Sequence, residues 1–357
     1  MHMRLGKLLT VTLFGESHGA MVGALIEGIP PGLVIDEIYI QQCMDMRRPG
    51  GHFASKRKES DIVEISTGVY QGVSTGQPIL LIIRNNDARS SDYSFIPNHP
   101  RPGHQDMVMN IRTDGHADLR GGGSSSARLT AGLVAAAAII SPLLGEIQID
   151  AHVGAIGDIE AKPIELCPPE WENELCKSLR CRDPSAAESM KECIEKVRSE
   201  RNSIGSRIDL RVTNLPIGIG EPWFDGIEPA LGRAFFAIPA CRGVEFGRGF
   251  SAVTMTGIEH NSPWGGSSSN PLQIGERPDG SLAGMTSGSD IHARIALKPP
   301  SSIAQEQTTL DLAEDAQKQL VVKGRHDPVL GPRGVSVAIA MTKIVLADLI
   351  LRKRDAF

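Results

Sequence analysis

The stretch that decides the fold is residues 120–140, RGGGSSSARLTAGLVAAAAII, where a glycine and serine run changes directly into an alanine-rich apolar run. From Ser126 onward the sequence predicts a buried helix, and its small side chains suit a central layer packed closely against its neighbours. The apolar run 131–144 is too short to span a bilayer and contains Pro142. We therefore expect a helix at the centre of a soluble protein.

Strand-like segments lie on both sides of this helix in the sequence. Residues 8–14 (LLTVTLF) mix β-branched and other apolar residues and lead into the polar turn GESHG at 15–19. Residues 62–83 resemble two strands divided by a glycine-rich turn, with a buried run at 79–83. Further strands are predicted at 208–219, 250–258 and 290–297.

Three further helices are predicted from capping residues and apolar spacing. Asp36 should cap a helix that ends near Met46, and Ser185 with Glu188 fits a capping box that opens a surface helix. Residues 335–351 should form an apolar helix that ends in basic residues. Helices and strands follow one another without a steady βαβ rhythm, which favours an α+β fold. No low-complexity linker divides the chain, so we expect a single domain over residues 1–357.

Composition excludes several classes of function. The net charge is −5 and aromatic residues make up only 4% of the 357 residues, which argues against a nucleic-acid-binding surface. An anionic ligand would need a local cluster of Arg and Lys. The six cysteines form no C-x-x-C pair, so we expect no metal site and a reduced, cytoplasmic protein. No secretory signal or membrane span is expected.

Polar residues gather in four clusters punctuated by glycine or proline: residues 15–19 (GESHG), 101–106 (RPGHQD), 120–128 (RGGGSSSAR) and 324–328 (GRHDP). The third cluster runs into a helix, so its backbone N–H groups could hold an anion, although the G-K-[ST] ending of a Walker loop is missing. Histidine can supply protons at neutral pH, arginine can bind phosphate through paired hydrogen bonds, and Asp327 can act as a base. Together the clusters are typical of chemistry on a phosphate ester.

These clusters occur here in the order and approximate spacing of one enzyme family. The blocks G-E-S-H-G, R-P-G-H-x-D, R-G-G-G-x-S-S-A-R, I-P-A at 238–240, G-V-E-F-G at 243–247, K-P-x-S-S at 298–302 and G-R-H-D-P resemble chorismate synthase from about Lys7 to Arg354. Any one motif could arise by chance, whereas the ordered set is specific.

The resemblance implies the conversion of 5-enolpyruvylshikimate 3-phosphate to chorismate, the last common step of the shikimate pathway. That reaction is an anti 1,4-elimination of phosphate, and it needs reduced FMN without net redox change. The family's fold would be a β-α-β sandwich with a central layer of helices, assembled as a homotetramer. Some members reduce their own flavin with NADPH. No reductase-like segment is visible here, so we favour dependence on external reduced FMN.

The resemblance also implies roles for individual residues. The catalytic set would be His18, which protonates or stabilises the reduced flavin, His104, the general acid near the phosphate, and Asp327, which acts with the flavin in removing the ring proton. Substrate-binding residues would be Ser17, Arg47, Arg48 and Arg128. The flavin site would be formed by Ser124, Ser125, Ser126, Pro239, Ala240, Ala283, Lys298, Pro299, Pro300, Ser301, Ser302 and Arg325. His116 and His326 match no family histidine and are left outside the catalytic set.

The chain departs from the family pattern at several positions. Ser124 and Leu129 stand where the family has Arg and Glu, Phe53 falls near a family Arg, and Ala283 falls on a family Gly. These departures leave open an alternative, a family member that binds flavin or a phosphorylated ligand without turnover. Because His18, His104 and Asp327 are retained, we expect an active enzyme.

Overall fold

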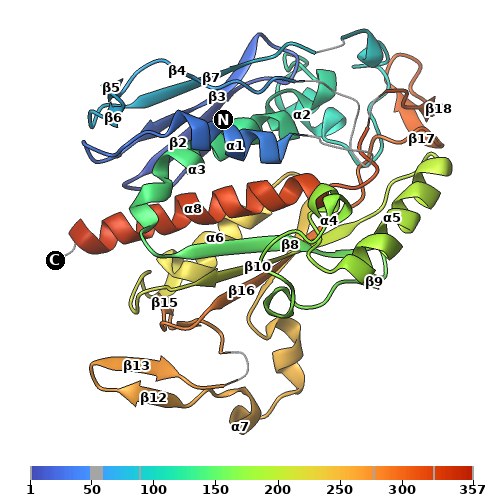
Figure 1. Ribbon diagram of the computed structural model, residues 1–357. Helices are drawn as coiled ribbons and strands as arrows, with labels where there is room; N and C mark the ends of the chain where they lie inside the picture. The colour runs from blue at the N-terminus through green and yellow to red at the C-terminus, as the bar shows by residue number, and fades with distance from the viewer. Residues whose placement is uncertain (1, 49–58, 88–89, 276–277, 325, 356–357) are drawn as a thin grey trace.

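Two antiparallel sheets form the frame of the molecule (Figure 1). The structure, a computed structural model, describes residues 2–48, 59–87, 90–275, 278–324 and 326–355. The first sheet has the order β1-β2-β3-β7-β4, and its strands are Arg4–Leu5, Thr10–Gly15, Met21–Glu27, Ile79–Arg84 and Glu64–Ile65, respectively. The apolar residues of β7 alternate between buried and half-buried positions, so one face of this sheet is turned to the core.

The second sheet comes from the C-terminal two thirds of the chain. Its order is β11-β16-β10-β8-β9, and its strands are Cys241–Phe246, Ile291–Leu297, Ser206–Thr213, Gln148–Ile156 and Ile159–Glu160. Every neighbouring pair in this sheet is antiparallel. The strand β16 alternates strictly between buried and less buried residues, as expected when one face packs on a core.

Helices fill the space between the two sheets. The helix α3 (Thr130–Ile140) packs on β3 and β7 of the first sheet, and α8 (Gly331–Asp355) packs on β8 and β10 of the second. These two helices also pack on each other, and α1 (Glu37–Arg47) and α6 (Ile227–Phe236) complete the layer. Figure 1 shows α8 in red below the blue first sheet and above the green β8.

The close approach of α3 to the first sheet depends on its small residues. All eleven residues of α3 are buried. A methyl group added at Gly132 would lie 2.7 Å from the carbonyl oxygen of Gly23 on β3, so glycine is needed at this crossing. By length and composition alone, Ala127–Leu144 and Gly331–Arg354 could each cross a membrane, but 78% of each window is buried inside the fold. Both are therefore core helices.

The remaining elements are short and lie around this frame. They comprise the hairpins β5–β6 (Val69–Tyr70, Val73–Ser74), β12–β13 (Trp264–Ser267, Asn270–Gln273), β14–β15 (Ser281–Leu282, Met285–Thr286) and β17–β18 (Glu306–Asp311, Ala316–Val321), and the helices α2 (Asp106–Arg112), α4 (Glu174–Leu179), α5 (Pro184–Ser199) and α7 (Gly257–His260). The segments 120–125 and 127–129 are 3-10 turns that lead into α3. Figure 1 shows β12–β13 projecting below the second sheet.

Most of the predicted elements are present. The α+β class is confirmed, since strands and helices are mixed along the chain. Asp36 caps α1 by accepting a hydrogen bond from the Tyr39 N–H, and strands occupy the predicted positions at β2, β10 and β16. The predicted C-terminal helix is α8, which extends further at both ends.

Three local predictions were wrong. Residues 250–258 form a 3-10 turn and the start of α7 instead of a strand. The cap of α5 is Asp183, which accepts from the N–H groups of Ser185 and Ala186, because Pro184 already occupies the first helical position. Residues 62–83 hold four short strands instead of two. The first and third predictions relied on apolar patterns, which do not show where turns interrupt a segment.

Candidate active site

A cavity of about 540 Å³ gathers most of the residues that the sequence predicted for the site. It lies where five loops converge: 101–105 before α2, 120–127 before α3, 239–240 before β11, 298–302 after β16 and 326–327 before α8. Of the predicted residues, the cavity is lined by His104, Ser125, Ser126, Pro239, Ala240, Lys298, Pro299, Pro300, Ser301, Ser302 and Asp327. Residues about 225 positions apart in the chain thus meet in one place.

Hydrogen bonds hold these loops against one another. The Lys298 backbone N–H donates to the carbonyl of Ala240 at 2.9 Å, and the Lys298 ammonium donates to the carbonyl of Gly103 at 2.6 Å. The Ser301 hydroxyl donates to the same Gly103 carbonyl at 2.8 Å. Ala240 has a φ of +74°, a strained conformation for a residue with a Cβ atom, and such strain is typical of functional sites.

His104 is oriented by a carboxylate. Its Nδ1 lies 2.6 Å from Oδ1 of Asp106 and donates to it, because the Arg101 Nη2 at 3.1 Å is itself a donor. This arrangement fixes the tautomer and leaves Nε2 as the ring atom that exchanges protons. The imidazole is partly exposed, with 22% of the side chain accessible, and it lines the cavity. The histidine is therefore positioned as a general acid or base.

Asp106 is itself held in the ionised form. Burial raises its pKa, but hydrogen bonds from Arg101 and His104 outweigh that effect and keep the pKa of Asp106 well below its usual range. Arg101 donates to both carboxylate oxygens, from Nε at 2.7 Å and Nη2 at 2.8 Å, and its Nη1 reaches the Ser302 hydroxyl at 3.2 Å. One buried guanidinium thus connects the histidine's partner to the 298–302 loop.

His18 lies directly behind the glycine loop. Its Nδ1 is 3.0 Å from the Ser17 hydroxyl, which donates to the carbonyl of Arg120 at 3.1 Å, so Nδ1 carries the hydrogen. Tyr93, which lines the cavity, meets the imidazole edge-to-face at 5.0 Å. A methyl group at Gly121 would stand 2.4 Å from Cε1 of His18. Glycine is therefore required where the loop separates this histidine from the cavity.

Asp327 lies at the start of the loop that leads into α8. Its Oδ2 accepts from Arg333 Nη1 at 2.6 Å, and only 9% of its side chain is exposed. Arg333 and His326 also line the cavity. The carboxylate thus faces the same space as His104, from the opposite end of the chain.

Cations surround this space. Burial, and to a smaller extent the positive charge of nearby Arg242, lowers the pKa of Lys298. Arg242, Lys298 and Arg333 all line the cavity, whereas Asp327 is its one lining carboxylate among the described residues. Such an excess of positive charge, in a protein of negative net charge, suits an anionic substrate.

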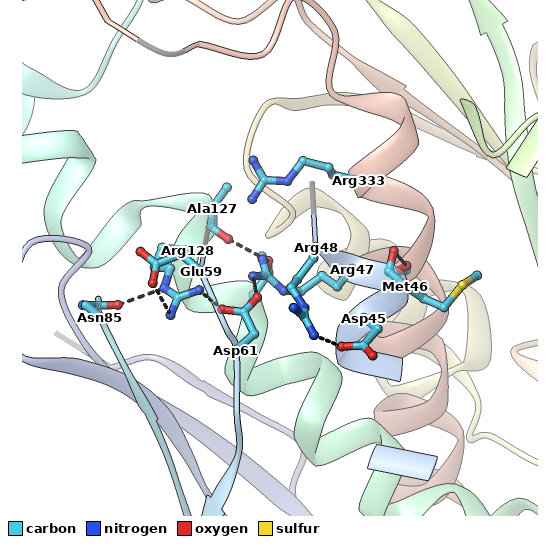
Figure 2. A network of polar contacts seen from close by, with 12 residues as sticks. Asp45, Met46, Arg47, Arg48, Glu59, Asp61, Asn85, Ala127, Arg128 and Arg333 are labelled. Carbon is cyan, nitrogen blue, oxygen red and sulfur yellow. Dashed lines mark hydrogen bonds and ion pairs between the residues drawn. The ribbon is translucent and has the colours of Figure 1, made fainter. Parts of the chain in front are cut away.

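Two of the predicted substrate arginines are bound in a buried ion network beside the cavity (Figure 2). Arg47 donates to Asp61 at 2.5 Å, and Arg128 also pairs with Asp61, whose side chain is fully buried. Burial lowers the pKa of Arg47 to about 10. Figure 2 shows Arg333, the partner of Asp327, reaching from α8 toward these groups, and its positive charge further lowers the pKa of Arg47. Arg48 lies outside it and pairs with Asp45.

The other predicted residues do not line this cavity. Ser124 and Leu129, two of the four departures from the family pattern, face a neighbouring cavity of about 540 Å³. This cavity shares with the first the residues Ser125, Ser126, Pro239, Ala240 and Arg242. Ala283 lies in the turn of the β14–β15 hairpin, with a φ of +52°. Arg325 and Phe53 lie outside the described residues.

The sequence analysis assigned no role to five lining or supporting residues: Tyr93, Arg101, Asp106, Arg242 and Arg333. Arg101 and Asp106 stand in the 101–106 cluster, and Asp106 follows His104 by two residues, so both could have been assigned. Arg333 could have been suspected because it follows Asp327 by only six residues, in the first turn of α8. Tyr93 and Arg242 carry no local signal, because only the tertiary fold brings them to the cavity.

The residues present fit a flavin and a phosphorylated acid. The volume falls within the range of small-molecule sites, roughly 300–1,000 Å³. Hydroxyls, a strained peptide and cations all line this space. Within the described residues, no group of three or more His, Cys, Asp or Glu side chains is arranged to hold a metal ion.

Comparison with known proteins agrees with this geometry. A family model described as chorismate synthase matches residues 9–351. The chorismate synthase of Aeropyrum pernix is 45% identical over 353 residues, with 97% of this chain and 92% of the relative covered. That of Methanosarcina mazei is 42% identical, with 97% and 95% covered.

A solved structure agrees as well. A crystal structure of chorismate synthase superposes with a TM-score of 0.75 at 28% identity, and the match covers 98% of this chain and 93% of that one. The match thus extends over both sheets, the helices between them and every loop of the cavity. The chain belongs to the chorismate synthase family.

Proposed function

We propose that this chain converts 5-enolpyruvylshikimate 3-phosphate to chorismate and phosphate in the cavity of about 540 Å³. Family membership supports the reaction. The observation that carries the assignment to this cavity is that His104, Asp327 and the cationic side chains of Arg101, Arg242, Lys298 and Arg333 line one space. An elimination of phosphate needs these three functions: an acid for the leaving group, a base for the ring proton and positive charge for the anion.

The protein's own residues would act as follows. His104 would donate the proton on Nε2 to the phosphate oxygen as the C–O bond breaks, and Asp106 would stabilise the imidazolium before that transfer. Asp327 would accept the proton lost from the ring. Arg242 would bind substrate anions, and Arg333 would hold Asp327 in place.

Reduced FMN, when bound, supplies electron density to the bond that breaks, and the reaction ends with no net redox change. We assign its binding to Ser125, Ser126, Pro239, Ala240 and residues 298–302. His18 would stabilise the reduced flavin from behind Gly121. Arg47 and Arg128 are proposed to support the substrate site through the Asp61 network.

The position of Ser124 and Leu129 bears on the alternative of binding without turnover. Both departures face the neighbouring cavity, whereas His104 and Asp327 face the proposed active site. This placement favours an active enzyme whose second cavity differs from that of its relatives.

We further propose that the layered arrangement is the family's sandwich, assembled as a homotetramer in the cytoplasm. Exposed apolar residues support a subunit contact below the second sheet, since Phe250, Val253 and Ile258 are each more than 80% exposed. We propose that the chain uses FMN that has been reduced elsewhere; the alternative is that the chain reduces its bound FMN with NADPH.

An anaerobic assay tests the function. Protein, reduced FMN and 5-enolpyruvylshikimate 3-phosphate should yield equal amounts of chorismate and phosphate, whereas folded protein that yields neither would contradict the proposal. A parallel reaction with NADPH and oxidised FMN should be inactive if the chain depends on external reduced flavin. Formation of chorismate in that reaction would show that this chain reduces FMN with NADPH.

A further inference from the structure

A third cavity, of about 410 Å³, lies between the helical layer and the edge of the second sheet. Its floor is apolar and comes from α1, α3 and α8, with Met46, Val134, Ala138 and Ile339 among the lining residues. None of its lining residues belongs to the proposed active-site cavity. It is therefore a separate space.

The other wall of this cavity is cationic and aromatic. The guanidinium of Arg180 lies 5.8 Å from the centre of the Trp171 ring, and that of Arg182 lies 5.5 Å from it. Lys343 also lines the cavity and donates to the Tyr39 hydroxyl at 2.9 Å. Two guanidinium groups thus lie on the indole ring, and a third cation, Lys343, lies over the Tyr39 ring at the same cavity.

The carboxylates around this cavity are fewer than the cations. Arg182 pairs with Asp150 at 2.6 Å, but among the described residues no carboxylate forms an ion pair with Arg180. Arg180 donates from Nη2 to the carbonyl of Met46 at 2.9 Å, while its Nη1 is buried without a hydrogen-bond partner. The Nε of Arg182 is likewise buried without one. Buried donors without a partner are uncommon in folded proteins.

Arg180 is also held in a costly conformation. It ends α4 in the left-handed region, with a φ of +55°, where a long side chain is uncommon. Burial lowers its pKa, with no compensating carboxylate. The backbone thus directs a guanidinium to a place that the protein itself leaves without a counter-charge.

We propose that this cavity binds a small amphipathic carboxylate, with its apolar body on the helical floor and its carboxylate on Arg180 and Arg182. The floor excludes a strongly polar anion such as free phosphate, because the lining is largely aliphatic. Planar guanidinium groups match the geometry of a carboxylate. The ligand class is therefore an aryl or alkyl monocarboxylic acid.

Binding of 3-phenylpropionate and of its neutral counterpart 3-phenylpropan-1-ol, measured by calorimetry on the full-length protein, tests this site. The acid should bind at least about tenfold more tightly than the alcohol, the factor expected for one charge-assisted hydrogen bond. Arg180→Met should remove that preference. Lys177→Met is the matched control, since it removes a cation from the same helix outside the cavity and should leave binding unchanged.

A second variant covers the case in which Arg180→Met does not fold. Gln42 is exposed and lines the cavity from α1, so Gln42→Trp should block the site without disturbing the core. Lys298→Met alters the active-site cavity alone and should leave binding of the acid intact. The proposal is overturned if the wild type does not bind the acid at millimolar concentration. It is also overturned if Gln42→Trp leaves binding unchanged or Lys298→Met abolishes it.

Discussion

Replacing Asp106 by Asn tests the orientation of His104. Asp106 accepts four hydrogen bonds at 2.6–3.0 Å, three from Arg101 and one from His104. Asn offers one oxygen and a competing NH₂ group, so at least two of these bonds are lost, and the charge is lost from all four. Breaking a buried ion pair from one side costs about 3–5 kcal/mol, so we expect a clear drop in the free energy of unfolding.

The effect on turnover should exceed the effect on binding. Without the carboxylate, His104 no longer has a fixed tautomer, and general acid catalysis is worth about 10²–10⁴-fold. We therefore expect kcat to fall by about 100-fold or more in the anaerobic assay at a temperature where the variant is folded, with a smaller change in KM. Asp114→Asn is the control, because that carboxylate is exposed in the loop after the same helix. A folded Asp106→Asn variant with kcat within twofold of wild type would refute this role.

Three further predictions follow from the geometry. Gly121→Ala should lower kcat and flavin affinity, because the added methyl group would stand 2.4 Å from His18 and the residue has a φ of +60°. Flavin titration of the folded variant measures the affinity, and an unchanged value would contradict this prediction. Asp61→Asn should lower the free energy of unfolding by about 3–5 kcal/mol, because Arg47 loses its buried partner; urea denaturation measures the change, and a loss under 1 kcal/mol would count against it. In the folded state, the pKa values of Asp61 and Asp106 lie below the ordinary value of an Asp carboxyl. The ionised carboxylates therefore stabilise the fold above about pH 4, and this contribution to the free energy of unfolding is lost as the pH falls below that value. Equal free energies of unfolding at about pH 3 and about pH 7 would contradict the assignment.

The sequence predicted the elements of the core because their patterns are local. The continuous apolar run 131–140 indicates a buried helix, and the Asp36 cap involves only Asp36 and the backbone N–H three residues later. The strand predicted at 250–258 failed because its apolar residues are exposed on a short helical segment instead of buried in a sheet. Apolar composition alone does not distinguish these cases.

The candidate site was predictable where motifs carry the residues and unpredictable where only the fold does. His104, Asp327 and residues 298–302 lie in motifs, and the structure brings them to one cavity. Asp106 belongs to the same motif as His104, but the motif does not show that it orients the imidazole, and Arg333 lies outside the motifs altogether. Arg128 also belongs to a motif, but in the folded protein it forms an ion pair with the buried carboxylate of Asp61.

We propose that this one cavity holds reduced flavin and substrate together and that His104 acts within it. Anaerobic stopped-flow mixing of the protein and reduced FMN with 5-enolpyruvylshikimate 3-phosphate tests it most directly, with flavin absorbance and phosphate release followed in the same reaction. We predict a transient change in flavin absorbance in the wild type that accompanies phosphate release, and a marked slowing of phosphate release in His104→Ala. A wild-type protein that binds flavin and substrate but shows neither a transient nor phosphate release would contradict the account.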